Sequence, residues 1–159
     1  MRLEPEHIAA IRAIVAEQAG DDATVRLFGS RLEITDRRLF AQPFTVERAR
    51  SLDDDEDLAE RVEAFVSRFD RLQDTTGDKL LPAYLAAHGE RLATFIENLD
   101  RAERLGLIDD AQGWLDMRRL RNQMIHEYVE DPHVLASALE AAHAFVPILV
   151  ATARRMSIV

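Results

Sequence analysis

The stretch LAERVEAFVSRFDRL, residues 58–72, decides the fold class, because its apolar residues recur at intervals of three or four. In an α-helix that spacing gathers them on one face and leaves the charged residues on the other. The acidic run of residues 53–57 stands directly before the stretch, where carboxylates favour the start of a helix. The sequence therefore predicts an amphipathic helix with a solvated, acidic start. Its apolar stripe consists of Leu58, Val62, Phe65, Val66, Phe69 and Leu72.

The same helical spacing extends beyond this stretch. We expect the helix to continue, bent or interrupted near residues 75–77, as far as Gly89. Further helices follow, one ending at Gly106 and one ending before Asp131. Residues from about 36 to 157 then form four or five antiparallel helices, which predicts a helical bundle. Helix caps are expected at Thr45 and at Asp109 or Asp110, and the last apolar stripe consists of Leu135, Leu139, Ala142, Val146, Leu149, Ala153 and Met156.

The N-terminal part has a different pattern. Residues 5–19 have helical spacing and end at Gly20, whereas residues 24–28 are apolar and β-branched enough for a short strand. That strand would run into a turn at Gly29 and Ser30. We therefore expect a short helix–strand segment before the bundle.

Length and composition indicate a single compact domain in which this segment, residues 1–33, precedes the helical bundle, residues 34–159. The chain has 159 residues, 47% of them hydrophobic and 31% charged, which is enough apolar surface for a buried core. The absence of cysteine excludes disulfides, thiolate metal sites and thiol nucleophiles. We expect a mainly α, cytoplasmic protein without a membrane span, since no run approaches about 18 apolar residues and the first residues do not resemble a signal peptide.

The charge balance limits any contact with nucleic acid to a local site. The net charge is −9, and the field of the whole molecule repels a phosphate backbone. Nineteen of the 20 cationic side chains are nevertheless arginine, which suits bidentate phosphate contacts. The alternative is a solvated face in which arginines form ion pairs with Glu103 and Asp116. The arginines expected to contact RNA are Arg101, Arg104, Arg118 and Arg119, next to Arg121.

The residues best suited to chemistry lie within RNQMIHEY, residues 121–128. Asn122 and His126 share a helical face, whereas Arg121 and His126 lie about 140° apart, so one helix cannot close them into a tight site. If two subunits meet with this helix at their two-fold axis, the cleft between them is lined by two copies of Arg121 and two of His126. Because an imidazole can move a proton and a guanidinium can hold a phosphate, such a cleft can cleave RNA through its own 2′-hydroxyl, without a metal or another cofactor.

Arg121 and His126 also have a purely structural interpretation. Arg121 can form an ion pair with Glu127 or another neighbour, while His126 caps the end of the helix through its dipole. The remaining histidines lack metal-ligand spacing and are expected on the surface or in packing, so we expect no metal site. These histidines are His7, His88, His133 and His143.

The octet RNQMIHEY resembles the R-N-x-x-x-H-x-Y motif of HEPN-domain proteins, in particular the HepT-like toxins of bacterial toxin–antitoxin systems. The resemblance covers about residues 34–157. It implies an all-α homodimer with metal-independent ribonuclease activity, in which Arg121 stabilises the phosphate, His126 transfers a proton and Asn122 supports the pair. It also implies that a partner nucleotidyltransferase modifies Tyr128 by AMPylation, which would block RNA sterically and by charge.

Residues 2–31 resemble the start of a minimal, MntA-like nucleotidyltransferase antitoxin, with Gly29 and Ser30 at its triphosphate-binding turn. Such an enzyme needs an Asp-x-Asp pair about ten residues later to hold magnesium, and only Asp36 is near. The pair Asp53 and Asp55 lies in the acidic run and not on a strand. We therefore expect no nucleotidyl transfer by this chain and a structural use of the segment.

Three functions agree with these features. The first is a dimeric HEPN ribonuclease toxin that binds RNA and has a nucleotidyltransferase antitoxin as its partner. The second is a non-catalytic HEPN module that binds, or is AMPylated by, that partner. The third is a plain oligomerisation domain, which would show neither RNA cleavage nor modification of Tyr128.

Overall fold

The structure is a computed structural model, and it describes residues 22–91, 93–126 and 131–157 together with residues 5, 6, 9 and 13. The described residues form helices joined by short loops, and no β-strand occurs among them. In chain order the elements are α2 (Asp22–Leu39), α3 (Val46–Arg50), the 3₁₀ turn η1 (Ser51–Asp53), α4 (Glu56–Asp74), the π-helical segment η2 (Thr75–Leu80), α5 (Leu81–Ala87), α6 (Phe95–Arg104), α7 (Ala111–His126) and α8 (Pro132–Ser157).

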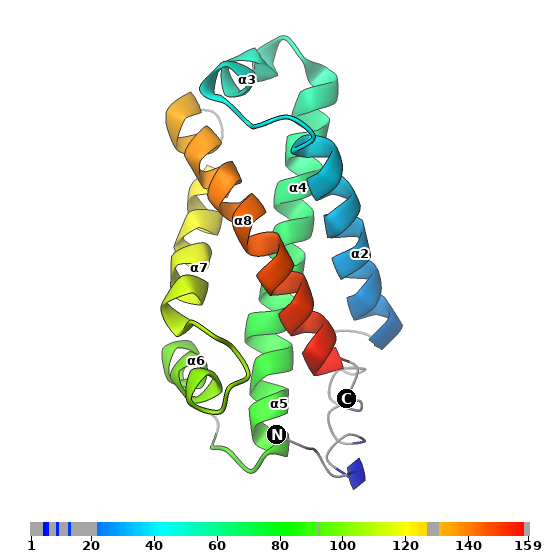
Figure 1. The fold of residues 1–159 in the computed structure, drawn as a ribbon, viewed down its shortest axis with the longest axis vertical. Coiled ribbons are helices and arrows are strands. Elements are labelled where there is room, and N and C mark those ends of the chain that lie inside the picture. The colour runs from blue at the N-terminus through cyan, green and yellow to red at the C-terminus, as the bar shows by residue number, and fades with distance from the viewer. Residues whose placement is uncertain are drawn as a thin grey trace.

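The helices pack as an elongated bundle around α4 and α8 (Figure 1). Figure 1 shows α4 and α5 as one long column, which α8 crosses obliquely between α7 and α2. Helix α8 packs against α2, α3, α4 and α7, and α2 also packs against α4. Apolar side chains from these helices meet in a shared core. The expected mainly α, bundle-like fold is therefore confirmed.

Helix α4 follows the pattern that the sequence predicts. The side chain of Asp55 accepts a hydrogen bond from the backbone N–H of Leu58 at 3.1 Å and caps the helix, and the acidic residues 53–57 are exposed. Val66 is half-buried at the margin of the stripe. Segment η2 joins α4 to α5, which confirms the interruption expected near residues 75–77. The buried members of the stripe are Leu58, Val62, Phe65, Phe69 and Leu72.

Helix α8 buries all of its expected stripe, from Leu135 to Met156. By length and composition alone, its segment Pro132–Met156 is long and apolar enough to cross a membrane. Half of the apolar window in that segment is buried inside the bundle. Such burial is typical of a core helix, whose apolar side chains are covered by neighbouring helices.

The expected helix ends are confirmed at several loops. Thr45 caps α3 by accepting a hydrogen bond from a backbone N–H of the first turn at 3.2 Å, and Asp110 does the same for α7 at 3.1 Å. Gly89 and Gly106 have φ values of +79° and +74°. Glycine adopts this left-handed conformation without a steric cost, so each of these residues ends a helix.

The expected helix–strand segment is wrong where the structure describes it. Residues 24–28, expected as a strand, lie in α2, and this helix runs across the expected boundary between residues 33 and 34. Val25, Leu32 and Leu39 recur at intervals of seven and are buried in the core. Because this two-turn period lets α2 pack on α4 and α8, tertiary packing outweighs the strand-like composition of five residues.

Gly29 and Ser30 lie within α2 and do not form the expected turn. Gly29 is buried at a place where an added Cβ would lie 3.6 Å from Cγ1 of Val150 in α8, and Ser30 is exposed. The backbone N–H groups of a helix interior donate to carbonyls one turn away, so they are not available to a phosphate. The expected turn at Gly29 and Ser30 is therefore wrong.

Candidate functional site

Helix α7 positions the residues to which the sequence assigns chemistry. The side chain of Arg121 is 17% exposed, whereas Asn122 is exposed. His126 is the last residue of α7, and its backbone lies about 140° around the helix from that of Arg121. The side chain of His126 and the whole of Tyr128 lie outside the described residues. The described part of the site is therefore the surroundings of the Arg121 guanidinium.

Two carboxylates of α4 hold Arg121. Its Nε lies 2.9 Å from Oδ1 of Asp70, and its Nη1 donates a hydrogen bond to Oδ1 of Asp74. About one turn earlier on α7, Nη1 of Arg118 lies 3.4 Å from Oδ1 of Asp78 in η2. The three carboxylates are spaced by four residues and therefore follow one edge of the α4–η2 column. We call Asp70, Asp74, Asp78, Arg118 and Arg121 the acidic ladder.

The acidic ladder has more negative than positive groups. Burial raises the pKa of Asp70 above its usual value of 3.8, Arg121 opposes this rise, and Asp74 adds to it. The contact between Arg121 Nε and Asp70 is an ion pair that lacks the alignment of a hydrogen bond. A phosphate that approaches Arg121 therefore competes with two carboxylates for the guanidinium.

Arg121 forms ion pairs, as its structural interpretation predicts. The observed partners are carboxylates of α4. Glu127, the expected partner, lies outside the described residues. The expected ion pairs with Glu103 and Asp116 are wrong within the described part of the chain. Glu103 accepts a hydrogen bond from the N–H of Ala111 at 2.7 Å, and Asp116 accepts one from the side chain of Gln112 at 2.9 Å.

The other arginines expected to contact RNA are divided between two places. Arg118 belongs to the acidic ladder, and its guanidinium also lies over the ring of Phe95, 4.1 Å from the centroid. Arg119 is exposed on α7. Arg101 and Arg104 line a separate hollow of about 180 Å³ beside α6. The structure thus joins Arg118 to Arg121 and places the α6 pair apart.

The described histidines outside the octet serve packing or lie on the surface, as expected. His143 stacks on Phe40 at a centroid distance of 4.2 Å, and its Nδ1 lies 2.7 Å from Oδ1 of Asp36. Burial raises the pKa of Asp36, and the hydrogen bond to His143 opposes that rise. His133 is exposed beside Asp131, and the ring of His88 contacts that of Tyr84. His7 lies outside the described residues. Within the described ranges, no group of three or more histidines and carboxylates could hold a metal ion.

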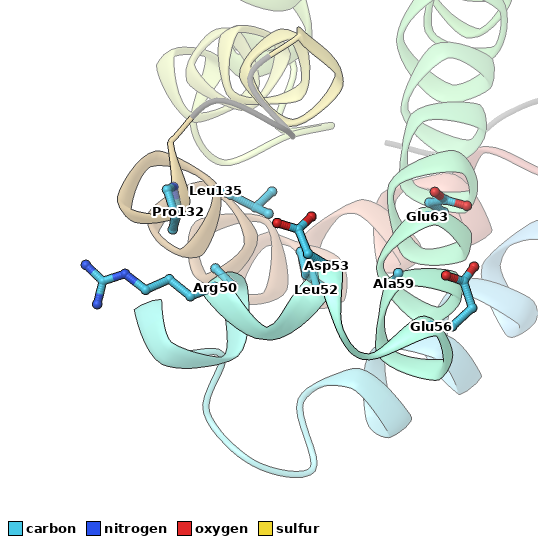
Figure 2. Close-up of a pocket in the computed structure, with 9 residues that line it drawn as sticks. Arg50, Leu52, Asp53, Glu56, Ala59, Glu63, Pro132 and Leu135 are labelled. Atoms are coloured by element: carbon cyan, nitrogen blue, oxygen red, sulfur yellow. The ribbon is translucent and has the colours of Figure 1, made fainter.

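A hollow of about 420 Å³ lies between η1, the start of α4 and the start of α8 (Figure 2). Three carboxylates line it, those of Asp53, Glu56 and Glu63. Figure 2 shows Arg50 extending away from them. The hollow contains none of the expected site residues, and its negative charge disfavours a phosphate ligand.

A second hollow, of about 360 Å³, lies between α2 and α4 and was not foreseen from the sequence. Arg38 of α2 and Arg61 and Arg68 of α4 line it. We call it the arginine groove. The available signal was the spacing of seven between Arg61 and Arg68 and between Arg31 and Arg38, which repeats a position on a helix every two turns. Because part of α2 is expected as a strand, the spacing of its arginines does not predict a shared helical face.

Comparison with known proteins finds no match: no family model, no curated protein and no solved structure is similar to this chain. The resemblance of the octet to the HEPN motif therefore stays a prediction. So does the resemblance of the N-terminal segment to an antitoxin. The function has to be inferred from the residues of α7, α4 and α2 themselves.

Proposed function

We propose that this protein is a metal-independent endoribonuclease of the HEPN kind, the toxin of a toxin–antitoxin pair, which acts as a homodimer in the cytoplasm. The observation that carries the proposal is the fixed guanidinium of Arg121, held by Asp70 and Asp74 on the helix that ends at His126. Its contacts within the described structure use Nε and Nη1, which leaves the donors of Nη2 for a phosphate oxygen. Donors fixed in advance stabilise developing charge without rearrangement.

In the proposed reaction, the ribose 2′-oxygen attacks the adjacent phosphorus. The bond between phosphorus and the 5′-oxygen breaks, and the products are a 2′,3′-cyclic phosphate and a 5′-hydroxyl group. The imidazole of one His126 accepts the proton of the 2′-hydroxyl, and the second His126 of the homodimer, in its protonated form, donates a proton to the leaving oxygen. Arg121 balances the charge that builds on the phosphate, and Asn122 supports the pair.

Cleavage of single-stranded RNA in the presence of a chelator tests this proposal. Arg121→Ala and His126→Ala should each lower the rate by about 100-fold or more, because a charge-stabilising donor and a proton-transfer group are lost. Arg50→Ala removes the same charge from the acidic hollow and should keep full activity. Undiminished cleavage by both site variants would remove these residues from the mechanism, and a strictly monomeric protein in light scattering would exclude the shared cleft.

One observation favours a second function, that of a non-catalytic HEPN module with an MntA-like nucleotidyltransferase partner. Because the acidic ladder compensates Arg121, this guanidinium attracts phosphate less than a free one. In this function the Tyr128 oxygen attacks the α-phosphorus of ATP, pyrophosphate leaves, and the phenolic proton is released. Intact-mass measurement with the partner, ATP and magnesium tests it, and Tyr128→Phe is the control. An unmodified wild-type chain would exclude AMPylation of Tyr128 and would count against this function.

A further inference from the structure

Residues of both α2 and α4 line the arginine groove. Thr35 lies at its α2 side and is 5% exposed, and Ala64 of α4 lies between Arg61 and Arg68 in the sequence. Asp57 and Glu60, both exposed, also contribute to its lining. The lining of the hollow therefore combines two small residues with three guanidinium groups and two carboxylates.

Arg68 is oriented by groups that carry no charge. Its Nη1 donates hydrogen bonds to the backbone carbonyl of Arg31, at 3.1 Å, and to Oγ1 of Thr35. Farther along α4, the guanidinium of Arg71 lies over the ring of Phe28, 5.4 Å from its centroid. Both arginines are held against α2 by groups other than a carboxylate.

The arginines of this seam form no ion pair with a carboxylate in the described part of the chain. They therefore produce a local positive potential on a protein whose net charge is −9. Planar guanidinium groups bind phosphate oxygens in pairs, which favours a phosphate over other anions as ligand. The seam arginines are Arg31, Arg38, Arg61, Arg68 and Arg71.

The arginine groove and the acidic ladder lie on opposite flanks of the same helix. At 100° per residue, Arg68 and Asp70 are about 200° apart around α4, and Arg71 falls between them on the exposed side. From Arg61 to Arg71 the helix advances by about 15 Å, a length that covers a few phosphates of one strand. Arg71 therefore offers a cation between the groove and Arg121, on a side of α4 that also carries Glu63 and Asp74.

We propose that the arginine groove binds the phosphate backbone of single-stranded RNA and guides the strand toward Arg121. That the bound strand is RNA rests on the proposed ribonuclease function. Binding of the strand to the groove does not require its cleavage. Leu27 and Ile34 are exposed on α2, 45% and 39%, so an acidic, partly apolar protein segment is the competing class of ligand. Phosphate is favoured because the three arginines of the lining outnumber its two carboxylates and their planar guanidinium groups fit phosphate oxygens in pairs.

Binding is measured by fluorescence anisotropy with a labelled oligouridine whose 2′-hydroxyls are methylated, so that it cannot be cleaved. The double variant Arg38→Gln/Arg61→Gln should bind about tenfold more weakly at low salt, since two charge-assisted contacts are lost. Between about 50 and 200 mM salt, its logarithmic salt slope should be shallower by about 1.4, or about 0.7 for each phosphate contact. Arg50→Gln, which removes one positive charge elsewhere on the protein, should bind like wild type.

Three outcomes would overturn the proposal: wild-type affinity in the double variant, an equal loss in Arg50→Gln, or absence of RNA binding by wild type. Equally tight binding of a polyglutamate peptide with the same dependence on Arg38 and Arg61 would assign the groove to an acidic protein instead. Failure of the ribonuclease function is a different result, since the oligouridine would then bind through the groove while unmethylated RNA stayed intact. Thermal melting should be unchanged, because Arg38 and Arg61 are exposed.

Discussion

Helix α4 has arginine contacts of opposite character on its two flanks. Toward α7, Arg118 and Arg121 meet the three carboxylates of the acidic ladder. Toward α2, Arg68 of the groove donates hydrogen bonds to a carbonyl and a hydroxyl, and Arg71 next to the groove lies over an aromatic ring. The first arrangement compensates charge and ties two helices together, whereas the second leaves positive charge exposed. The placement of carboxylates, and not the number of arginines, thus decides where an anion is attracted.

Loss of Arg121 should have the largest effect on stability. Arg121→Ala leaves Asp70 and Asp74 without their cation and should lower the free energy of unfolding by about 2 kcal/mol, less than for a fully buried pair because Asp74 is 44% exposed. Arg61→Ala removes an exposed, unpaired arginine and should change the free energy of unfolding by less than about 0.5 kcal/mol. Urea unfolding measures both. Equal losses of unfolding free energy in the two variants would show that the α7 and α2 flanks of α4 do not differ in how they hold their arginines.

A further carboxylate in the arginine groove, in addition to Asp57 and Glu60, should cancel its excess of positive charge. Ala64→Glu sets a negative charge between Arg61 and Arg68 and should weaken RNA binding about tenfold at low salt. Ala64→Gln has nearly the same size without the charge and should bind much like wild type. Anisotropy with the methylated oligouridine compares them. A similar loss in both variants would point to steric blocking.

The wall of the groove depends on α2 being helical at Gly29. Gly29→Ala should raise the free energy of unfolding by about 0.5–1 kcal/mol, because alanine favours a helix and its Cβ would make only an ordinary contact with Val150 at 3.6 Å. Gly106→Ala is the control and should destabilise, since its φ of +74° disfavours a side chain. Destabilisation by Gly29→Ala in urea unfolding would support a turn instead.

The smallest effect concerns the pH dependence of the acidic ladder. Because the pKa of Asp70 lies above its usual value in the folded protein, the folded state binds its proton more tightly than the unfolded state. The resulting stabilisation is complete below about pH 3.8 and is lost as the pH rises through the raised pKa. Asp70→Asn should remove this decline, as measured by urea unfolding across that range. Asp53→Asn, which changes an exposed carboxylate, should keep it.

The sequence predicted those elements in which local signals agree over many residues. In α4 and α8 a long apolar stripe follows an aspartate that caps the start of the helix, so local preference and packing demand the same structure. In α2 they conflict, because residues 24–28 have strand-like composition while Val25, Leu32 and Leu39 keep a helical period. The longer period was available in the sequence, but its weight became clear only from the packing of α2 on α4 and α8.

In the candidate site, too, the sequence predicted what depends on neighbouring residues and missed the contacts between distant ones. The octet placed Arg121, Asn122 and His126 on one helix, and the structure agrees with that placement. The partners of Arg121 were not predictable from neighbouring residues, because Asp74 lies 47 positions away in the sequence. The arginine groove was missed for the same reason, since Arg31 and Arg68 are 37 positions apart.

The sequence by itself determined that the chain is helical, where most of its helices begin and end, and which helix carries the octet, because these properties depend on residues within a few turns of one another. Only the tertiary structure decided which arginines are neutralised and which remain free to attract an anion. The physical reason is that electrostatic interactions depend on distance through space, and the packing of α2 and α7 on α4 sets those distances.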